Sequence, residues 1–436
     1  METVVKKERG MSGKILAIIF MAVGGTLLVA GFACQHLFRA LAPNVLRTIQ
    51  FDPVLFGLIG LVVFIVGIAK IASRNKRMEF TQFSKAKVYS FLLNNAIILA
   101  MLVFAIVVFI INRKFLTVRA FSDILGQAVP KMFLALGVSF SLIIAGTDLS
   151  AGRIMGVASV VVATLVQKWD FYGKFWQNFN TTEGGFLNSA LYLVLPILLA
   201  LVVCGLFGLF NGFLVAQFKM HPFIATLATS VIAWGVNGLY FEKPPLKGSP
   251  IGGLRSDFTV IGTSRLGNSD FMRNILGADS FGGIATMVIY AIVACVVIWF
   301  ILNKTTFGKN VYAVGGNPEA AKVSGVNSYL TILIVFVIGG LMYGMGGIIE
   351  AARTAGATSA YGAGFELDAI AACVVGGVSL TGGVGKIRGI ITGVLTFEII
   401  RYGLIFIGVS PWYQQIIKGL IIVVAVALDL AKYNKK

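Results

Sequence analysis

Long apolar runs separated by short polar stretches form the dominant pattern of this chain. Runs of about 17 to 25 residues match the thickness of a bilayer's hydrocarbon core when they form helices. The pattern predicts an all-α polytopic membrane protein with about twelve transmembrane helices. The expected spans are 14–33, 54–71, 91–111, 130–146, 151–167, 190–215, 222–240, 284–302, 329–350, 365–381, 389–408 and 413–431.

The polar stretch 304–330 predicts a short capped helix between two of these spans. Asn317 can cap its first turn, and Pro318 fits the first helical position, where no backbone donor is needed. Gly325 can end the helix in a left-handed conformation. A helix of about two turns is not stable alone, so we expect the flanking spans to hold it in place for a partner. The docking unit is expected at 315–325, with 304–314 as one connecting arm.

The distribution of Lys and Arg predicts the orientation, because cytoplasmic loops of membrane proteins are rich in these residues. With the N-terminus inside, the basic segments 70–90 and 304–330 and the basic C-terminal tail fall inside. Loops 168–189 and 241–283 fall outside. Loop 112–129 is also assigned outside, although it carries three basic residues. Both termini are therefore expected to be cytoplasmic.

Composition narrows the class of protein. Of the 436 residues, 57% are hydrophobic and only 12% are charged, against about 25% in soluble domains. The net charge of +18 could suggest nucleic-acid binding, but basic cytoplasmic loops explain it better. The four cysteines lie far apart in or beside apolar runs, which indicates neither a metal site nor a disulfide framework.

Two domains are expected. Residues 1–90 form an extension with two spans and a basic cytoplasmic linker, and 91–433 form the core. Within the core, Ala145–Val157 and Phe365–Arg388 each interrupt apolar sequence with Gly, Ser, Thr and a carboxylate. Interrupted helices in two halves of a chain point to a transport pathway. Irregular backbone at membrane depth must line a cavity or lie buried in protein.

Motifs for catalysis are missing from the sequence. There is no HExxH, GxSxG or CxxC, and no GxxxxGK[ST] loop for nucleotide phosphates. A membrane enzyme would need a nucleophile, metal or acid–base cluster that the sequence does not offer. The chain is therefore expected not to be an enzyme and not to hydrolyse ATP. Energy for transport must come from a partner or from an ion gradient.

Polar residues within the spans are functional candidates, because they are costly in a membrane. For the first interrupted segment, Ala145–Val157, the alternative to a pathway role is a structural one. Asp148 or Ser150 would cap the next helix, and Arg153 would pair with Asp148. Glu398 and Arg401, three residues apart, predict an intramembrane ion pair, with a gating role as the alternative. The candidate pathway residues are Asp148, Ser150, Arg153, Asn211, Glu366 and Asp368.

Two further expectations follow from the same reasoning. Glu350 and Arg353 are expected to neutralise each other at the end of a span, and Asn211 and Asn237 to form hydrogen bonds across helices. Most membrane carboxylates have a basic neighbour three to five residues away. This favours structural pairing over the titratable carboxylate that an ion-coupled secondary transporter needs.

Five segments resemble the permease subunit of bacterial ABC sugar importers, in the binding-protein-dependent ribose, xylose and galactose group. The resemblance covers about residues 91–433 and is to the galactose/methyl-galactoside branch; residues 1–90 are not part of the family's usual core. The segments are TDLSAGR (147–153), PFIATLAT (222–229), FGKNVYAVGGNPEAAKVSGVN (307–327), ELDAIAACVVGGVS (366–379) and IIKGLIIVVAVALD (416–429).

The resemblance implies a permease of the bacterial cytoplasmic (inner) membrane that imports galactose, methyl-galactoside or glucose. Ribose, xylose or nucleosides are the alternative substrates. The implied partners are a second permease copy, a cytoplasmic ABC ATPase, an extracytoplasmic sugar-binding protein and membrane lipid, with no nucleic acid. The chain itself binds no cofactor, since ATP is used by the ATPase. The implied ATPase-coupling helix comprises Gly315, Gly316, Asn317, Pro318, Glu319, Ala320, Ala321, Lys322 and Gly325.

Overall fold

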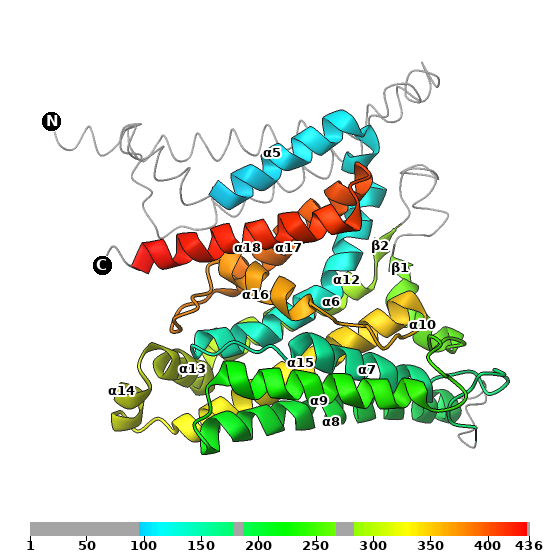
Figure 1. Ribbon diagram of the computed structural model, residues 1–436, viewed down its shortest axis with the longest axis horizontal. Helices are drawn as coiled ribbons and strands as arrows, with labels where there is room; N and C mark the ends of the chain where they lie inside the picture. The colour runs from blue at the N-terminus through cyan, green and yellow to red at the C-terminus, as the bar shows by residue number, and fades with distance from the viewer. Residues whose placement is uncertain (1–95, 178–185, 267–282, 434–436) are drawn as a thin grey trace, which may run out of the picture. The chain divides into compact units, whose positions relative to one another are not determined.

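The computed structural model describes residues 96–177, 186–266 and 283–433, which are almost entirely helical (Figure 1). The expected spans 14–33 and 54–71 and the extension 1–90 lie outside the described residues. A two-residue antiparallel pair, β1 (Arg265–Leu266) with β2 (Ile284–Ala285), is the sheet in this part of the chain. The helices are α5 (Ala96–Ile111), the 3-10 helix η1 (Arg113–Leu116), α6 (Val118–Ile143), α7 (Ala151–Leu165), α8 (Phe186–Gln217), α9 (Pro222–Glu242), α10 (Ser256–Thr263), α12 (Met287–Lys304), α13 (Thr306–Gly316), α14 (Pro318–Val323), α15 (Ser328–Thr354), α16 (Phe365–Val375), α17 (Ile387–Phe406) and α18 (Pro411–Tyr433).

Among the described residues, six helices are long and apolar enough to cross a membrane. They are Arg119–Ile143, Leu191–Gln217, Pro222–Glu242, Met287–Lys304, Ser328–Thr354 and Ile387–Phe406. Shorter apolar helices cover Met101–Ile111 and Ala151–Leu165. The all-α membrane architecture that the sequence predicts is confirmed in this part of the chain.

One expected span and one expected loop need correction. The span 365–381 is an 11-residue helix, α16, followed by turns. At 1.5 Å per residue, α16 is about 16 Å long and reaches across about half of a bilayer core. The expected loop 112–129 is mostly the first half of α6, which begins at Val118 and contains Pro130 within the helix. One charge of this segment, Asp123, forms an ion pair with Arg265 at 2.7 Å.

The described chain divides into two compact units. The described part of the first comprises residues 96–122, 283 and 403–408. Within it, Asn112 Nδ2 donates to the carbonyl of Phe406 at 3.4 Å, and the rings of Phe115 and Phe406 meet edge to face. The second unit holds the remaining described residues and every candidate site residue that the structure describes.

Close backbone contacts hold α15 against α7 and α8 in the second unit. A Cβ at Gly340 would meet the carbonyl of Cys204 in α8, and one at Gly347 would meet the carbonyl of Met155 in α7. Small residues allow this approach in lipid, where the hydrophobic effect does not drive helices together. Tyr343, on the same helix, is fully buried in the core. The three helices therefore form a tightly packed frame for the polar sites.

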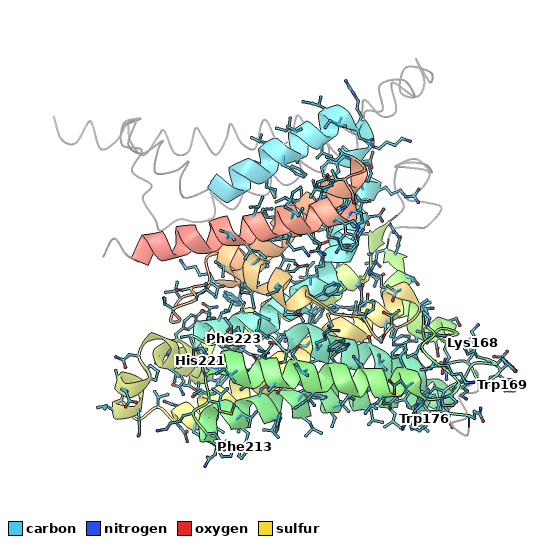
Figure 2. All side chains as sticks on the ribbon, viewed as in Figure 1. Lys168, Trp169, Trp176, Phe213, His221 and Phe223 are labelled. Carbon is cyan, nitrogen blue, oxygen red and sulfur yellow. The ribbon has the colours of Figure 1, made fainter. Side chains whose placement is uncertain are left out.

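Aromatic residues mark the two ends of α8 and α9. Trp169 and Trp176 lie with Lys168 at one end, and His221 and Phe223 lie at the other (Figure 2). The side chains of both tryptophans are exposed, as expected for residues at a membrane–water interface. Helices α13 and α14 lie at the end that carries His221 (Figure 1). That end is the one that the charge distribution assigns to the inside.

Candidate functional site

The predicted cap of the short polar helix is confirmed. Helix α14 begins with Pro318 at its first position, and the side chain of Asn317 accepts a hydrogen bond from the N–H of Ala320 at 3.0 Å. Its other end is closed by Gly325, whose φ is +81°. The Gly325 N–H donates to the Lys322 carbonyl, and the Val326 N–H donates to the Ala321 carbonyl, each at 3.0 Å. This pair of bonds is a Schellman motif, so both helix ends are satisfied by local groups.

The expected arm 304–314 is a helix of its own, which corrects the sequence interpretation. Helix α13 runs from Thr306 to Gly316, and Thr305 caps it by accepting from the Gly308 N–H at 3.1 Å. Gly315 and Gly316 therefore belong to the end of α13, and α14 itself is six residues long. The signal available in the sequence was the Thr305–Thr306 pair, since a threonine before a helix-forming run is a typical N-cap.

Helix α14 presents an exposed surface with one large apolar side chain. Glu319 and Lys322 are exposed, whereas Ala321 is buried against the rest of the fold. Val323 is 90% exposed at the last helical position. Sequence reasoning missed Val323, although an apolar residue between Lys322 and Ser324 in a polar helix end is a readable signal. A single exposed apolar side chain is ordinary on a protein surface, so Val323 by itself does not mark a binding surface.

Helix α13 joins this surface to a break in the membrane helices. Gly315 is buried, and a Cβ there would meet the carbonyl of Ile143 at the end of α6. The same carbonyl accepts from the Gly383 N–H at 2.8 Å. The hydroxyl of Tyr312 donates to the Gly385 carbonyl at 2.8 Å, and burial raises the pKa of that hydroxyl. Helix α13 thus touches both α6 and the turn-rich segment between α16 and α17.

Asp148 organises the break between α6 and α7. One carboxylate oxygen accepts from the N–H and the hydroxyl of Ser150, at 2.9 and 2.5 Å, and the other accepts from the Tyr343 hydroxyl at 3.0 Å. The Ser150 hydroxyl accepts from Asn211 Nδ2 at 2.8 Å, which confirms the predicted bond across helices for Asn211, whereas Asn237 Nδ2 has no hydrogen-bond partner in the described structure. All of these side chains are buried. The network ties α7, α8 and α15 together at one point.

The predicted pairing of Arg153 with Asp148 is wrong. The donors to Asp148 are neutral groups, and the guanidinium of Arg153 lies 5.1 Å from the centre of the Trp234 ring. Ser150 occupies the N-cap position of α7, but its side chain makes no capping hydrogen bond. Its hydroxyl donates to the Asp148 carboxylate instead.

The two interrupted segments meet in the structure. A Cβ at Gly152 would meet both the Glu366 carboxylate and the Gly362 carbonyl, and one at Gly156 would meet the Tyr361 carbonyl. Helix α16 therefore begins beside the first turns of α7. Glu366 and Asp368 both lie in the first turn of α16, as expected. Glu366 Oε2 has no hydrogen-bond partner in the described structure.

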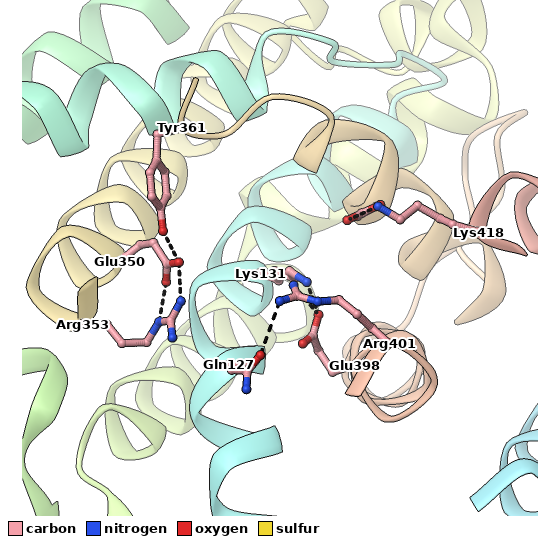
Figure 3. A network of polar contacts seen from close by, with 9 residues as sticks. Gln127, Lys131, Glu350, Arg353, Tyr361, Glu398, Arg401 and Lys418 are labelled. Carbon is pink, nitrogen blue, oxygen red and sulfur yellow. Dashed lines mark hydrogen bonds and ion pairs between the residues drawn. The ribbon is translucent and has the colours of Figure 1, made fainter. Parts of the chain in front are cut away.

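A buried ion cluster surrounds Glu398 (Figure 3). Its close partner is Lys131 of α6, whereas Arg401 Nη1 lies 3.8 Å away. Arg401 also donates to Gln127 at 3.3 Å. The predicted pair is present, but the stronger contact joins residues 267 positions apart, which local spacing cannot reveal. Asp368 is held separately by Lys418 of α18, at 2.9 and 3.1 Å.

The cavity inside this cluster is small. It measures about 30 Å³, is lined by the charged groups just named, and has room for about one water molecule. The pair Glu350–Arg353 is also confirmed: Arg353 donates twice to Glu350, at 2.8 and 2.5 Å, and Tyr361 donates to the same carboxylate (Figure 3). Among the residues that the structure describes, no three His, Cys, Asp or Glu side chains gather as metal ligands.

Comparison with known proteins gives consistent matches. A sequence model described as "branched-chain amino acid transport system / permease component" matches residues 120–426. The chain is 41% identical over 366 residues to the galactose/methyl galactoside import permease protein MglC of Escherichia coli, covering 84% of this chain and 100% of that protein. The corresponding protein of Treponema pallidum is 37% identical over 386 residues, covering 84% and 69%.

A relative with another substrate name also matches. The ribose import permease protein RbsC of Bacillus subtilis is 34% identical over 334 residues, which is 77% of this chain and 92% of that protein. No solved structure matches the chain.

Proposed function

Because the chain belongs to the branched-chain amino acid transport system / permease component family, we propose that it is the permease subunit of an ATP-driven monosaccharide importer. It is a multi-pass protein of the cytoplasmic membrane. The observation that carries the proposal is the exposed, doubly capped helix α14, attached through α13 to the breaks in the membrane helices. In this proposal a cytoplasmic ATPase docks on α14 and supplies the energy, and the chain needs no cofactor of its own.

The contacts of α13 support a mechanism of alternating access. A displacement of α14 by the ATPase would move α13. Gly315 of α13 packs closely against the Ile143 carbonyl, and the Tyr312 hydroxyl donates to the Gly385 carbonyl. Those two points lie at the end of α6 and just before α17. Motion of the ATPase would therefore change the angle between α6 and α7 and between α16 and α17. ATP closes the ATPase dimer, and the second permease copy receives the same motion on its own α14.

The pathway is proposed to run beside the two breaks. Glu366 Oε2 is without a partner and retains the capacity to accept a substrate hydroxyl when the pathway opens. Arg153, beside the Trp234 ring, offers donors and an aromatic face in the same region. The network of Asp148, Ser150 and Asn211 positions these groups rather than touching substrate. Asp368, held by Lys418, is proposed to line the pathway at the first turn of α16.

The substrate is proposed to be galactose, methyl-galactoside or glucose, delivered by an extracytoplasmic sugar-binding protein. This rests on the 41% identity to a galactose/methyl galactoside import permease. Ribose is the alternative that the 34% identity to a ribose import permease supports; xylose and nucleosides are further alternatives from the sequence resemblance. A panel of unlabelled sugars competing for uptake of labelled galactose in whole cells distinguishes these substrates.

The docking proposal is tested at Val323. We expect Val323→Asp to abolish co-purification of the ATPase, because it places a charge at the exposed apolar position of α14. Asn317→Ala should weaken co-purification by removing the cap, which is worth roughly 0.5–2 kcal/mol, whereas Asn317→Asp should retain it. The measurement is affinity purification of the complex from membranes.

The matched control is Lys309→Gln, which removes an exposed charge from α13 and leaves α14 intact. The melting temperature of each purified permease shows whether the membrane fold is unchanged. Normal ATPase recovery with Val323→Asp would contradict the docking assignment.

A further inference from the structure

A large apolar groove lies outside every site described so far. Its volume is about 540 Å³, and it is formed by α6, α12 and α17. Its walls are hydrophobic side chains with one charged residue, Arg388. The lining includes Met132 of α6, Val288, Ala291 and Trp299 of α12, and Arg388 and Leu395 of α17.

The size and chemistry of the groove indicate a hydrocarbon occupant. Its lining on α12 runs from Val288 to Trp299, a rise of about 16 Å, which is about half the thickness of a bilayer core. A space of this volume would hold many waters, yet its walls offer water almost no hydrogen-bond partners. A sugar would be equally unsatisfied. A lipid acyl chain matches both the length and the apolar lining.

Positive charge gathers at one end of the groove. Arg388 is exposed at the start of α17, and no ion pair in the described structure involves it. The exposed Lys386 lies two residues earlier. Lys304 Nζ lies 5.7 Å from the centre of the Trp299 ring, and Trp299 lines the groove together with Arg388. Cations beside a tryptophan at the end of a span are typical of the headgroup level of a membrane.

The charge also decides between possible occupants. A second copy of this chain has the same net charge of +18, and residues 1–95 carry 12 Lys and Arg against 4 Asp and Glu. In a two-fold contact made through this groove, Arg388, Lys386 and Lys304 of each copy would lie on the shared face, where like charges repel. Residues 1–95 have an excess of positive charge and offer no phosphate to these cations. A phosphate group complements them, and a guanidinium binds phosphate with two parallel hydrogen bonds.

We propose that this groove binds an anionic phospholipid, with an acyl chain between α6, α12 and α17 and its phosphate against Arg388. The lipid would fill the space between α12, which leads into α13, and α17, which carries Glu398. The proposal depends on the membrane location of the chain and not on the identity of the transported sugar. Its failure and the failure of the importer proposal are therefore separate outcomes.

Tryptophan fluorescence tests the site directly, because brominated acyl chains quench a tryptophan that they touch. Full-length protein and Trp299→Phe are reconstituted in bilayers with brominated phosphatidylglycerol or brominated phosphatidylcholine at equal mole fraction. The difference between the two proteins isolates Trp299. We expect roughly a fivefold preference for the anionic lipid, the effect of about one cation near an anionic lipid surface.

Variants separate the contact with the lipid headgroup from the contact with the lipid acyl chain. Arg388→Gln should abolish the anionic preference, Arg388→Lys should retain most of it, and Ala291→Phe should reduce quenching by both lipids by filling the groove. Arg113→Gln, an exposed arginine that does not line the groove, is the control and should change nothing. Equal quenching by the two lipids, unaffected by Arg388→Gln, would overturn the proposal. An absence of Trp299 quenching would also overturn it, by showing that protein covers the groove.

Discussion

Glu398 and Lys131 form a largely buried ion pair inside a membrane-spanning bundle. Their side chains are 2% and 11% exposed. Taking a charge out of water is costly, so each of these residues is tolerated only because the other is present. Arg401 is a secondary partner of Glu398, and its side chain is 37% exposed. The pair fastens α6 to α17.

We predict that Glu398→Gln lowers the thermal stability of the purified permease, because it leaves Lys131 buried without a counter-charge. Breaking a buried pair costs about 3–5 kcal/mol, whereas replacing both partners with apolar groups is often nearly neutral. The double variant Lys131→Met with Glu398→Leu should therefore be more stable than either single change. Unfolding in detergent, followed by intrinsic fluorescence, measures the difference.

The exposed pair Asp123–Arg265 is the control for this comparison. Its side chains are 28% and 35% exposed, so Asp123→Asn should cost no more than about 1 kcal/mol. If the double variant Lys131→Met with Glu398→Leu is as unstable as the single changes, the charges of Lys131 and Glu398 do not depend on each other.

Residue-level prediction from the sequence succeeded where partners are close along the chain. The Asn317 cap, the Gly325 termination and the Glu350–Arg353 pair all follow from spacings of three to eight residues. Lys131 was missed as the partner of Glu398, and Tyr343 as a donor to Asp148, since 267 and 195 residues separate them. Only the packing of α6, α15 and α17 brings such groups together.

At the level of elements, the turn-rich segment after α16 shows why hydropathy overestimates spans. Residues 365–381 are apolar enough to predict a full span, yet the helix ends at Val375. Gly377, Gly382 and Gly383 all have positive φ, which a helix cannot contain. The backbone leaves helical geometry after Val375, with Val378 and Ser379 buried and Gly377 and Thr381 exposed. A composition average cannot separate a buried half-helix with turns from a complete span.

The contact of α13 with α6 gives the element-level prediction. Gly315→Ala should reduce transport and loosen the permease, because its added methyl group would meet the Ile143 carbonyl, which is fixed in the backbone. Gly316→Ala should be neutral or slightly stabilising, since nothing lies within 4 Å of the added Cβ and alanine favours helix. Sugar uptake and melting temperature are measured for both. Equal effects of the two changes would count against a transmitting role for α13.

At the scale of the whole molecule, the family match begins at residue 120, and the relatives cover 77–84% of the chain. We propose that residues 1–90 are an extension of a permease core that works without them. Deletion of residues 1–88 is predicted to leave ATPase binding and sugar uptake intact. Uptake by cells, normalised to the amount of permease in the membrane, is the measurement. Loss of uptake by a correctly inserted truncated protein would show that the extension is required.

Sugar uptake into proteoliposomes tests the source of energy most directly. The permease is reconstituted with its ATPase and sugar-binding protein, and labelled galactose is offered on the side of the binding protein. We predict uptake that requires ATP, continues at an unchanged rate after an uncoupler collapses the proton gradient, and disappears with Val323→Asp. Uptake that stops with the uncoupler while ATP is held constant would contradict an ATP-driven importer and favour an ion-coupled transporter.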